Sequence, residues 1–274
     1  MLQEEWNFID TGAHSAIINM AIDEKLLTWH SEGKIPPTLR FYRWSNPSLS
    51  IGHFQNIEKT LDLSGIKKHN CQLVRRLTGG SAVLHDDELT YSLVVSEKHP
   101  AIPTTVRDAY FTLSKGIVQG YKHLGIQVEY AEPRRRIGLD QTAVCFEKVA
   151  YYEMVVDGKK ISGNAQTRIK DVLLQHGSIP MSMNEQLLFD LFQFPTEEVR
   201  HHKRADFFHK ATSINRYTNK IHRYVLLKEA FYHGFEAGLG VTFQPFQLTK
   251  EHWEEVLHLA HHKYATESWN TNKR

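Results

Sequence analysis

The sequence predicts an α+β fold in which a mixed, largely antiparallel central sheet is flanked by helices. Residues 151–179 have the pattern of three consecutive strands joined by tight polar turns, which suits antiparallel neighbours. Residues 15–31 and 104–124 repeat apolar side chains at the spacing of amphipathic helices. No repeat, low-complexity tract or linker interrupts the 274 residues. We therefore expect one domain over residues 1–274, with a core at about 35–245 and a helical extension at 246–274.

The first half of the chain contains the clearest helix signals. Ser15 can cap the first helix, and Gly33 follows its end. In the helix over 104–124, Thr105 and Asp108 resemble a capping box and a glycine follows the last turn. The other elements expected here are strands over 38–44, 49–54, 71–76, 89–95 and 126–131 and a short helix over 57–69.

The second half places a strand meander between two groups of helices. A polar loop over 133–144 leads to Cys145, and Asp157-Gly158 suits a two-residue hairpin turn because both positions accept positive φ. A second polar turn is expected over 168–171. The remaining elements expected are helices over 184–192, from Pro195, over 226–240 and over 249–262, and a strand over 241–248.

Composition limits the classes of function. The net charge is only +2, so the sequence lacks the strongly basic character typical of nucleic-acid binding. Two cysteines do not form a disulfide framework, and reduced thiols in the cytoplasm are expected. The N-terminus resembles no signal peptide, and no apolar run approaches the ~20 residues that cross a bilayer. We expect a soluble, cytoplasmic protein that binds neither nucleic acid nor membrane.

The seventeen histidines raise the possibility of a metal site. The pairs His201-His202 and His261-His262, with His258 one turn earlier, have spacings that could hold a metal ion. No cysteine or cluster of carboxylates accompanies them, so we expect exposed helix surface and no metal.

One thiol and one amine could form a reactive site. Cys145 precedes a strand, and Lys159 and Lys160 follow the turn at its far end. A neighbouring ammonium lowers a thiol's pKa and so supplies more of the nucleophilic thiolate. The alternative is that Cys145 is a small buried apolar residue and the lysines are a solvated turn.

The Gly-Gly loop, residues 78–81, allows the backbone to approach a bulky group closely. Arg75, Arg76 and His85 flank it, so the loop could bind a ligand. A plain hairpin loop would carry the same residues. His85 could anchor such a loop or be a structural histidine with satisfied hydrogen bonds.

The segments RRLTGGSAVLHDDELTYS (75–92), DGKKISGNAQTR (157–168) and QHGSI (175–179) resemble the biotin/lipoate protein ligase and octanoyltransferase superfamily. The likeness extends over most of the chain and implies the catalytic-domain fold of that superfamily. The pattern is most similar to LipM-type octanoyltransferases, which carry a cysteine in a Cys-Phe-acid context ahead of a Tyr-Glu strand. Here that cysteine is Cys145.

The resemblance assigns roles to particular residues. It implies that Cys145 is the acyl-thioester nucleophile, that Lys160 lies beside it and lowers its pKa, and that Lys159 is an exposed turn residue. His176 would orient groups or serve the structure and would not act as a base. The substrate-binding residues expected are Arg75, Gly79, Gly80, His85, Tyr91 and Gly163, and Tyr91 could equally belong to the sheet core.

The implied reaction is octanoyl transfer in protein lipoylation. Cys145 would accept the octanoyl group from octanoyl-acyl carrier protein and pass it to a lysine of a lipoyl domain, expected to be the glycine cleavage system H protein. Exchange between thioesters is nearly balanced and amide formation is downhill, so no nucleotide or other cofactor is required. The cations at 134–136, Lys159 and Lys170 could steer these acidic partners. We expect a monomeric enzyme.

Two alternatives remain at this stage. An ATP-dependent lipoate or biotin ligase would share the Gly-Gly and GKKISG motifs, but such ligases show an Asn-Asp pair where this chain has Tyr152-Glu153. A non-catalytic protein that binds acyl groups or docks a carrier could use the same scaffold.

Overall fold

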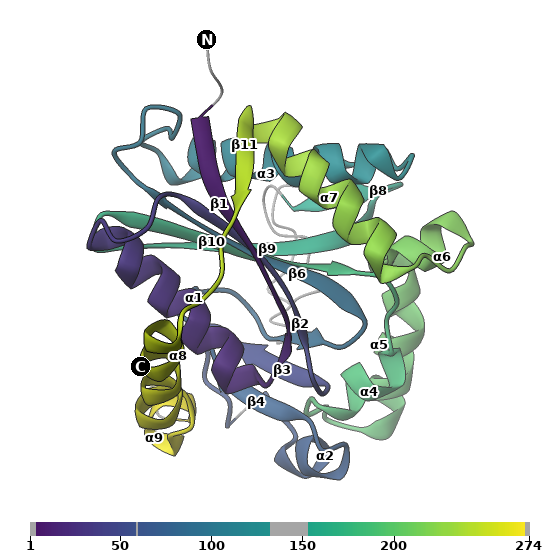
Figure 1. The fold of residues 1–274 in the computed structure, drawn as a ribbon. Helices are drawn as coiled ribbons and strands as arrows, with labels where there is room; N and C mark the ends of the chain where they lie inside the picture. Colours follow the sequence, from purple (N-terminus) through teal and green to yellow (C-terminus); the bar gives the residue numbers. More distant parts are fainter. Residues whose placement is uncertain (1–3, 59, 132–152, 272–274) are drawn as a thin grey trace.

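The computed structural model describes residues 4–58, 60–131 and 153–271 (Figure 1). Cys145, the cations at 134–136, Tyr151 and Tyr152 lie outside the described residues. In the first half the elements are β1 (Glu4–His14), α1 (Ala16–Ser31), β2 (Thr38–Trp44), β3 (Ser48–Ile51), α2 (Leu63–Lys68), β4 (Gln72–Arg75), β5 (Val83–His85), β6 (Glu88–Ser96), α3 (Val106–His123) and β7 (Glu129–Tyr130).

In the second half the elements are β8 (Met154–Val156), β9 (Lys159–Ile169), β10 (Val172–Pro180), α4 (Glu185–Asp190), α5 (Glu197–Lys210), α6 (Ile214–Thr218), α7 (Tyr224–Leu239), β11 (Val241–Pro245), α8 (Lys250–Leu259), the π-helix η2 (Ala260–Tyr264) and α9 (Glu267–Asn270). No helix in these described ranges is both long and apolar enough to cross a membrane.

Two sheets form the framework of the described residues. The larger runs in the order β11-β1-β2-β6-β10-β9-β8-β7, and the smaller in the order β4-β3-β5. In the larger sheet β1 pairs in parallel with both β11 and β2, whereas every other neighbouring pair is antiparallel. The prediction of a mixed, largely antiparallel sheet flanked by helices is therefore confirmed.

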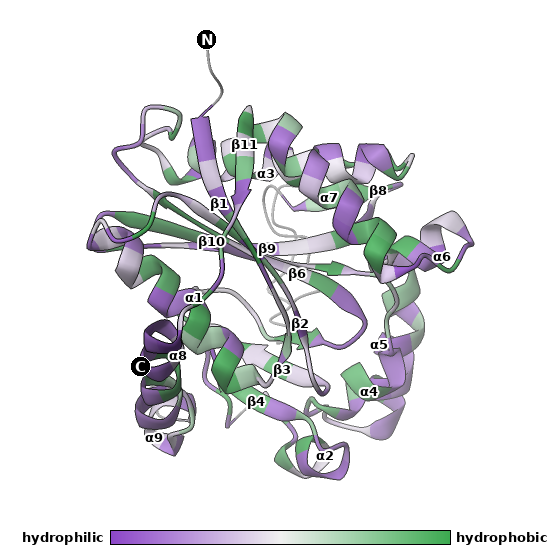
Figure 2. Ribbon diagram, in the orientation of Figure 1, coloured by the Kyte–Doolittle hydropathy of each residue, from purple (hydrophilic) through white to green (hydrophobic). Residues whose placement is uncertain are grey.

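The larger sheet is covered on both faces because its strands alternate their side chains. Leu39 and Phe41 of β2 join the core beneath α3 and α7, whereas Tyr42 and Trp44 join the core with α1 and α8. Figure 1 shows these two helix pairs on opposite sides of the sheet. In Figure 2 the hydrophobic colours gather in the inner strands, and α8 is largely hydrophilic.

Helices α3 and α7 pack unusually closely. A Cβ atom at Gly234 would lie 2.3 Å from the backbone nitrogen of Gly120, so these positions accept only hydrogen as a side chain. The close contact seats Phe231 and Phe235 against α3, and both rings are fully buried. This pair of helices therefore fixes one face of the sheet that carries the site.

The predicted turns are confirmed, and so is the predicted N-cap of α3. Asp157 and Gly158 have φ of 48° and 74°, as the hairpin turn requires, and the turn over 168–171 joins β9 to β10. Thr105 caps α3 through the Asp108 backbone nitrogen at 3.1 Å. Ser15 occupies the N-cap of α1, but its side chain makes no capping hydrogen bond.

Several boundaries were wrong. The helix expected over 57–69 spans only Leu63–Lys68, and the strand expected over 126–131 spans only Glu129–Tyr130. β1, β5, α6 and α9 were not predicted as elements. The histidine pairs at 201–202 and 261–262 are exposed on helices, as expected.

Candidate active site

A cavity of about 240 Å³ lies between the two sheets. Its walls come from α1, β2, β3, β5, β6, β9, β10, the Gly-Gly loop and the residue before β8. The lining residues are Met20, Tyr42, Trp44, Ser50, Arg76, Gly80, Ser81, Val83, His85, Thr90, Glu153, Gly163, Asn164, Ala165, His176, Gly177 and Ser178.

The Gly-Gly loop forms one wall and is held by Arg76. The guanidinium of Arg76 donates hydrogen bonds to the carbonyls of Gly79 and Ser81 at 2.7 and 2.9 Å. Gly80 has a φ of 98°, and its carbonyl packs so closely on Gly52 that a Cβ there would lie 1.9 Å away. The loop therefore has a fixed shape, and glycine is needed on both sides of the contact.

His85 lies in a second wall and has both ring nitrogens hydrogen-bonded. Its Nε2 contacts the Ser50 hydroxyl at 2.7 Å, and its Nδ1 contacts the Glu88 carboxylate at 2.7 Å. Its ring stacks on Trp44 with centroids 4.1 Å apart. His85 therefore lines the cavity with both ring nitrogens satisfied, and a role for it in binding substrate stays a prediction.

His176 joins the cavity to a buried charge network. Its Nε2 contacts the Thr78 hydroxyl at 2.7 Å, and its Nδ1 contacts the Asp23 carboxylate at 3.1 Å. Arg40 donates to the same carboxylate at 2.7 Å. Burial lowers the pKa of His176 below its ordinary value, so the ring is held neutral. Burial alone would raise the pKa of Asp23, but Arg40 and His176 together keep it below its usual range.

The lowered pKa of His176 predicts a loss of stability in mild acid. The unfolded chain takes up a proton near the ordinary value of 6.5, whereas the folded chain resists it. The unfolded state therefore binds more protons, and the free energy of unfolding falls as the pH drops from about 7.5 to about 5. Denaturant titrations at both pH values should show a smaller fall in His176→Gln. An equal fall in the two proteins would contradict this assignment.

Lys160 points into the protein beside the cavity. It lies on β9, its side chain is 0% exposed, and its ammonium forms an ion pair with Glu153, which lines the cavity. The segment after α5 also fixes the backbone at this position, since the Thr212 nitrogen donates a hydrogen bond to the Lys160 carbonyl at 2.9 Å. Burying an ammonium without such partners costs free energy, so the ion pair with Glu153 is needed to keep Lys160 in this position.

The structure brings together some of the residues expected to bind substrate. Gly80, His85 and Gly163 line the cavity, and Gly79 contributes the carbonyl that Arg76 holds. Tyr91 is fully buried in the sheet core and does not line the cavity. Its hydroxyl donates to Asn164 at 2.9 Å, and Asn164 does line the cavity.

Arg75 lies away from the cavity lining. Its guanidinium donates to the carbonyls of Gly52, His53 and Gln55 and to those of Trp269 and Asn270 near the C-terminus. These contacts tie the loop after β3 to the last helix. A role for Arg75 in binding substrate stays a prediction.

Sequence analysis named Arg76 as a flank of the Gly-Gly loop, His176 as an orienting or structural residue, and Glu153 as part of a Tyr-Glu pair, and all three line the cavity. It missed Trp44 and Ser50, because nothing in their local pattern indicates which strands surround the same space. The position of Cys145 relative to the Lys160 ammonium falls outside the described residues.

Comparison with known proteins shows which proteins the chain is similar to. A relative from Oceanobacillus iheyensis, named octanoyltransferase LipM, is 53% identical over 96% of each chain. A Bacillus subtilis relative of the same name is 47% identical over 98% of this chain and 99% of its own. These relatives confirm the resemblance to LipM-type octanoyltransferases.

Solved structures confirm the fold. A bi-partite lipoate protein ligase from Thermoplasma acidophilum aligns with a TM-score of 0.79 at 23% identity, covering 99% of this chain and 97% of that chain. Lipoate-protein ligase A bound with ATP aligns with a TM-score of 0.78 at 25% identity, covering 99% of both chains. The family model of the lipoyl protein ligase A/B catalytic domain matches residues 15–236. The chain therefore belongs to the lipoyl protein ligase A/B catalytic-domain family.

Proposed function

We propose that this enzyme transfers an octanoyl group from octanoyl-acyl carrier protein to a lysine of a lipoyl domain, by way of a thioester on Cys145. The observation that carries the proposal is a small cavity beside the buried, ion-paired Lys160, in a chain that is 53% identical to a named octanoyltransferase. The enzyme is an acyltransferase of protein lipoylation.

The cavity suits a short acyl chain. Its volume of about 240 Å³ is smaller than the ~300–1,000 Å³ of pockets for drug-sized ligands. Met20, Tyr42 and Trp44 give it apolar wall area. Burying the methylenes of an octanoyl tail at ~0.8 kcal/mol each would contribute ~5 kcal/mol to binding.

The chemistry proceeds in two exchanges. The Cys145 thiolate attacks the thioester carbonyl of the donor, and the carrier's thiol leaves as thiolate and takes up a proton. The acceptor's neutral lysine amine then attacks the acyl-enzyme, loses a proton, and releases the Cys145 thiolate as the amide forms. We assign Lys160 the role of stabilising the thiolate electrostatically.

The acceptor we propose is the H protein of the glycine cleavage system. A lipoyl domain as acceptor is supported by a protein of the same fold, since the Thermoplasma acidophilum structure is described as a lipoate protein ligase and its E2 lipoyl domain. We further propose that the enzyme acts in the cytoplasm, as a monomer with one catalytic domain. It uses no nucleotide and no metal, because the donor is already activated.

Intact-mass spectrometry tests the proposal directly. Mixing the enzyme with octanoyl-acyl carrier protein should add one octanoyl group to its mass, and adding a lipoyl domain should move that group to the acceptor. An enzyme of unchanged mass that still binds the carrier would point to a non-catalytic protein. Formation of octanoyl-adenylate from free octanoate and ATP would instead support a ligase, whose fold this chain shares.

A further inference from the structure

A basic surface, here called the α5–α7 surface, is formed by exposed and half-exposed side chains of residues 203–226. This stretch contains six lysines and arginines and a single carboxylate, Asp206, although the whole chain has a net charge of only +2. This stretch therefore carries a local excess of positive charge that the net charge of the whole chain does not reveal.

Much of this charge is not neutralised by the protein itself. Lys210 pairs with Asp206, and Arg216 pairs with Glu185 of α4. Among the described residues, Arg204, Lys220 and Arg223 form no ion pair with a carboxylate, and the last two are exposed. These cations are available to an acidic partner.

The same stretch exposes apolar side chains. Five of the nine large apolar residues exposed in the described ranges lie here, namely Phe208, Tyr217, Ile221, Val225 and Leu226. Ile221, between α6 and α7, is 93% exposed. Scattered apolar residues are ordinary on a surface, but a cluster ringed by cations is typical of a protein interface.

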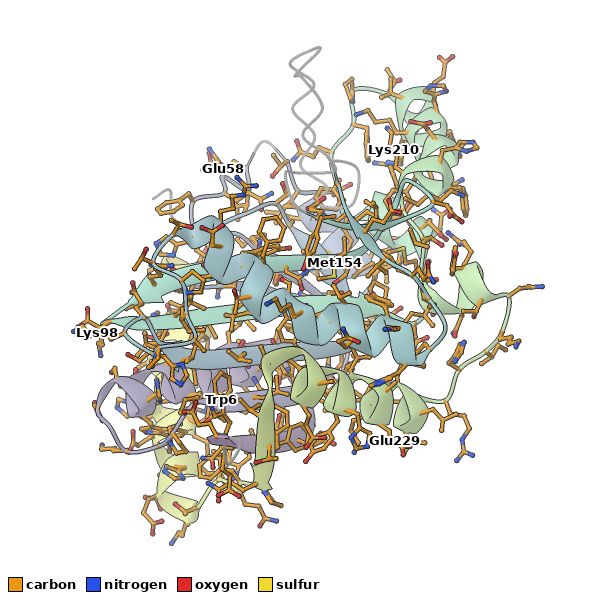
Figure 3. All side chains as sticks on the ribbon, turned by 90° about the horizontal axis from the view of Figure 1, so that it is seen from above. Trp6, Glu58, Lys98, Met154, Lys210 and Glu229 are labelled. Carbon is orange, nitrogen blue, oxygen red and sulfur yellow. The ribbon has the colours of Figure 1, made fainter. Side chains whose placement is uncertain are left out.

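The α5–α7 surface lies beside the candidate active site and does not line its cavity. The segment that follows α5 contacts β9, because Ala211 forms a β-bridge with Lys160 and the Thr212 nitrogen donates to the Lys160 carbonyl. None of the cavity-lining residues comes from α5, α6 or α7. Figure 1 shows α6 projecting from the body of the protein, and Figure 3 labels Lys210 at the end of α5.

This placement distinguishes between two kinds of acidic partner. An acceptor offers its own lysine side chain, so its surface must sit at the cavity mouth. A carrier presents its acyl group on a long flexible arm, so it can dock to one side while the arm enters the cavity. A surface that adjoins Lys160 but contributes nothing to the lining fits the second case.

We propose that the α5–α7 surface docks the acidic carrier protein that donates the acyl group, with its carboxylates on Lys220 and Arg223 and an apolar side chain on Ile221. The inference rests on the proposed function, and it adds to that function a binding site for the carrier protein that donates the acyl group. Charge complementarity of this kind acts mainly on the rate of association and on its dependence on salt.

The test compares two donors in stopped-flow measurements of enzyme acylation. In the double variant Lys220→Glu/Arg223→Glu, kcat/KM with octanoyl-acyl carrier protein should fall by about tenfold or more at low salt, and its salt dependence should flatten. With octanoyl-pantetheine, which has the arm but no carrier protein, kcat/KM should stay at the wild-type value. Ile221→Ser should raise KM for the carrier without altering the salt dependence.

A matched control carries the same charge change elsewhere. Lys115 and Lys122 are exposed on α3, and Lys115→Glu/Lys122→Glu should keep full activity with both donors. An equal loss in this control, a loss with octanoyl-pantetheine, or no loss in the surface variant would each overturn the proposal. So would a defect confined to transfer from preformed acyl-enzyme to the lipoyl domain, because the surface would then bind the acceptor. If the wild-type enzyme accepts no octanoyl group from either donor, the proposed function itself fails.

Discussion

Replacing Cys145 with serine is expected to lower octanoyl transfer by at least about a thousandfold. A serine hydroxyl ionises far less readily than a thiol, so it supplies almost no nucleophile at neutral pH, and an oxygen ester replaces the thioester. The measurement is the rate of octanoyl transfer from the carrier to a lipoyl domain, with acyl-enzyme followed by intact mass. We expect no mass increase in Cys145→Ser.

The other cysteine provides the matched control. Cys71 is buried, and burial raises its pKa to about 12, so it supplies negligible thiolate at neutral pH. Cys71→Ala should keep both the acyl adduct and the transfer rate, apart from a modest loss of stability. If Cys145→Ser transferred octanoyl at a rate near that of the wild type, or if the adduct mapped to Cys71, the nucleophile would be misassigned.

Replacing Lys160 with alanine is expected to impair both reactivity and stability. The loss of the ammonium should raise the pKa of the Cys145 thiol and shift its alkylation profile to higher pH. The same change removes the cation that pairs with Glu153 in a buried setting, and breaking such a pair costs about 3–5 kcal/mol. Alkylation rates measured against pH and denaturant titrations would report the two effects separately.

Lys159 is the matched control for this experiment. It is the neighbouring residue on β9, it is half-exposed, and Lys159→Ala should leave the alkylation profile and the stability close to wild type. An alkylation profile in folded Lys160→Ala that overlays the wild-type curve would show that another group activates the thiol. Lys160 would then be retained only as a structural ion-pair partner.

Local sequence patterns predicted the part of the site that neighbouring residues build. The turn at Asp157-Gly158 fixes the register of β8 and β9 and so places Lys160 on a strand that its own hairpin defines. The glycines at 79 and 80 indicated a close backbone approach, and the structure shows that approach against Gly52. These signals depend on φ preferences and on alternation, which a single sequence displays directly.

Contacts between distant segments could not be predicted in this way. Arg75 and Arg76 are adjacent in the chain, yet Arg75 holds the C-terminal segment and Arg76 holds the Gly-Gly loop. β1 was missed because its place in the sheet depends on β2 and β11, and the latter begins more than 200 residues later. No local preference reports which strand a segment will pair with.

By itself, the sequence determined the family, the hairpins that carry the GKKISG motif, and the glycine-rich wall of the candidate site. Only the tertiary structure decided that Lys160 is buried against Glu153, that Trp44, His85 and His176 surround one cavity, and that the basic stretch over 203–226 lies beside Lys160. The physical reason is that backbone preferences act over a few residues. Burial, ion pairing and surface charge are instead set by residues that only the folded chain brings together.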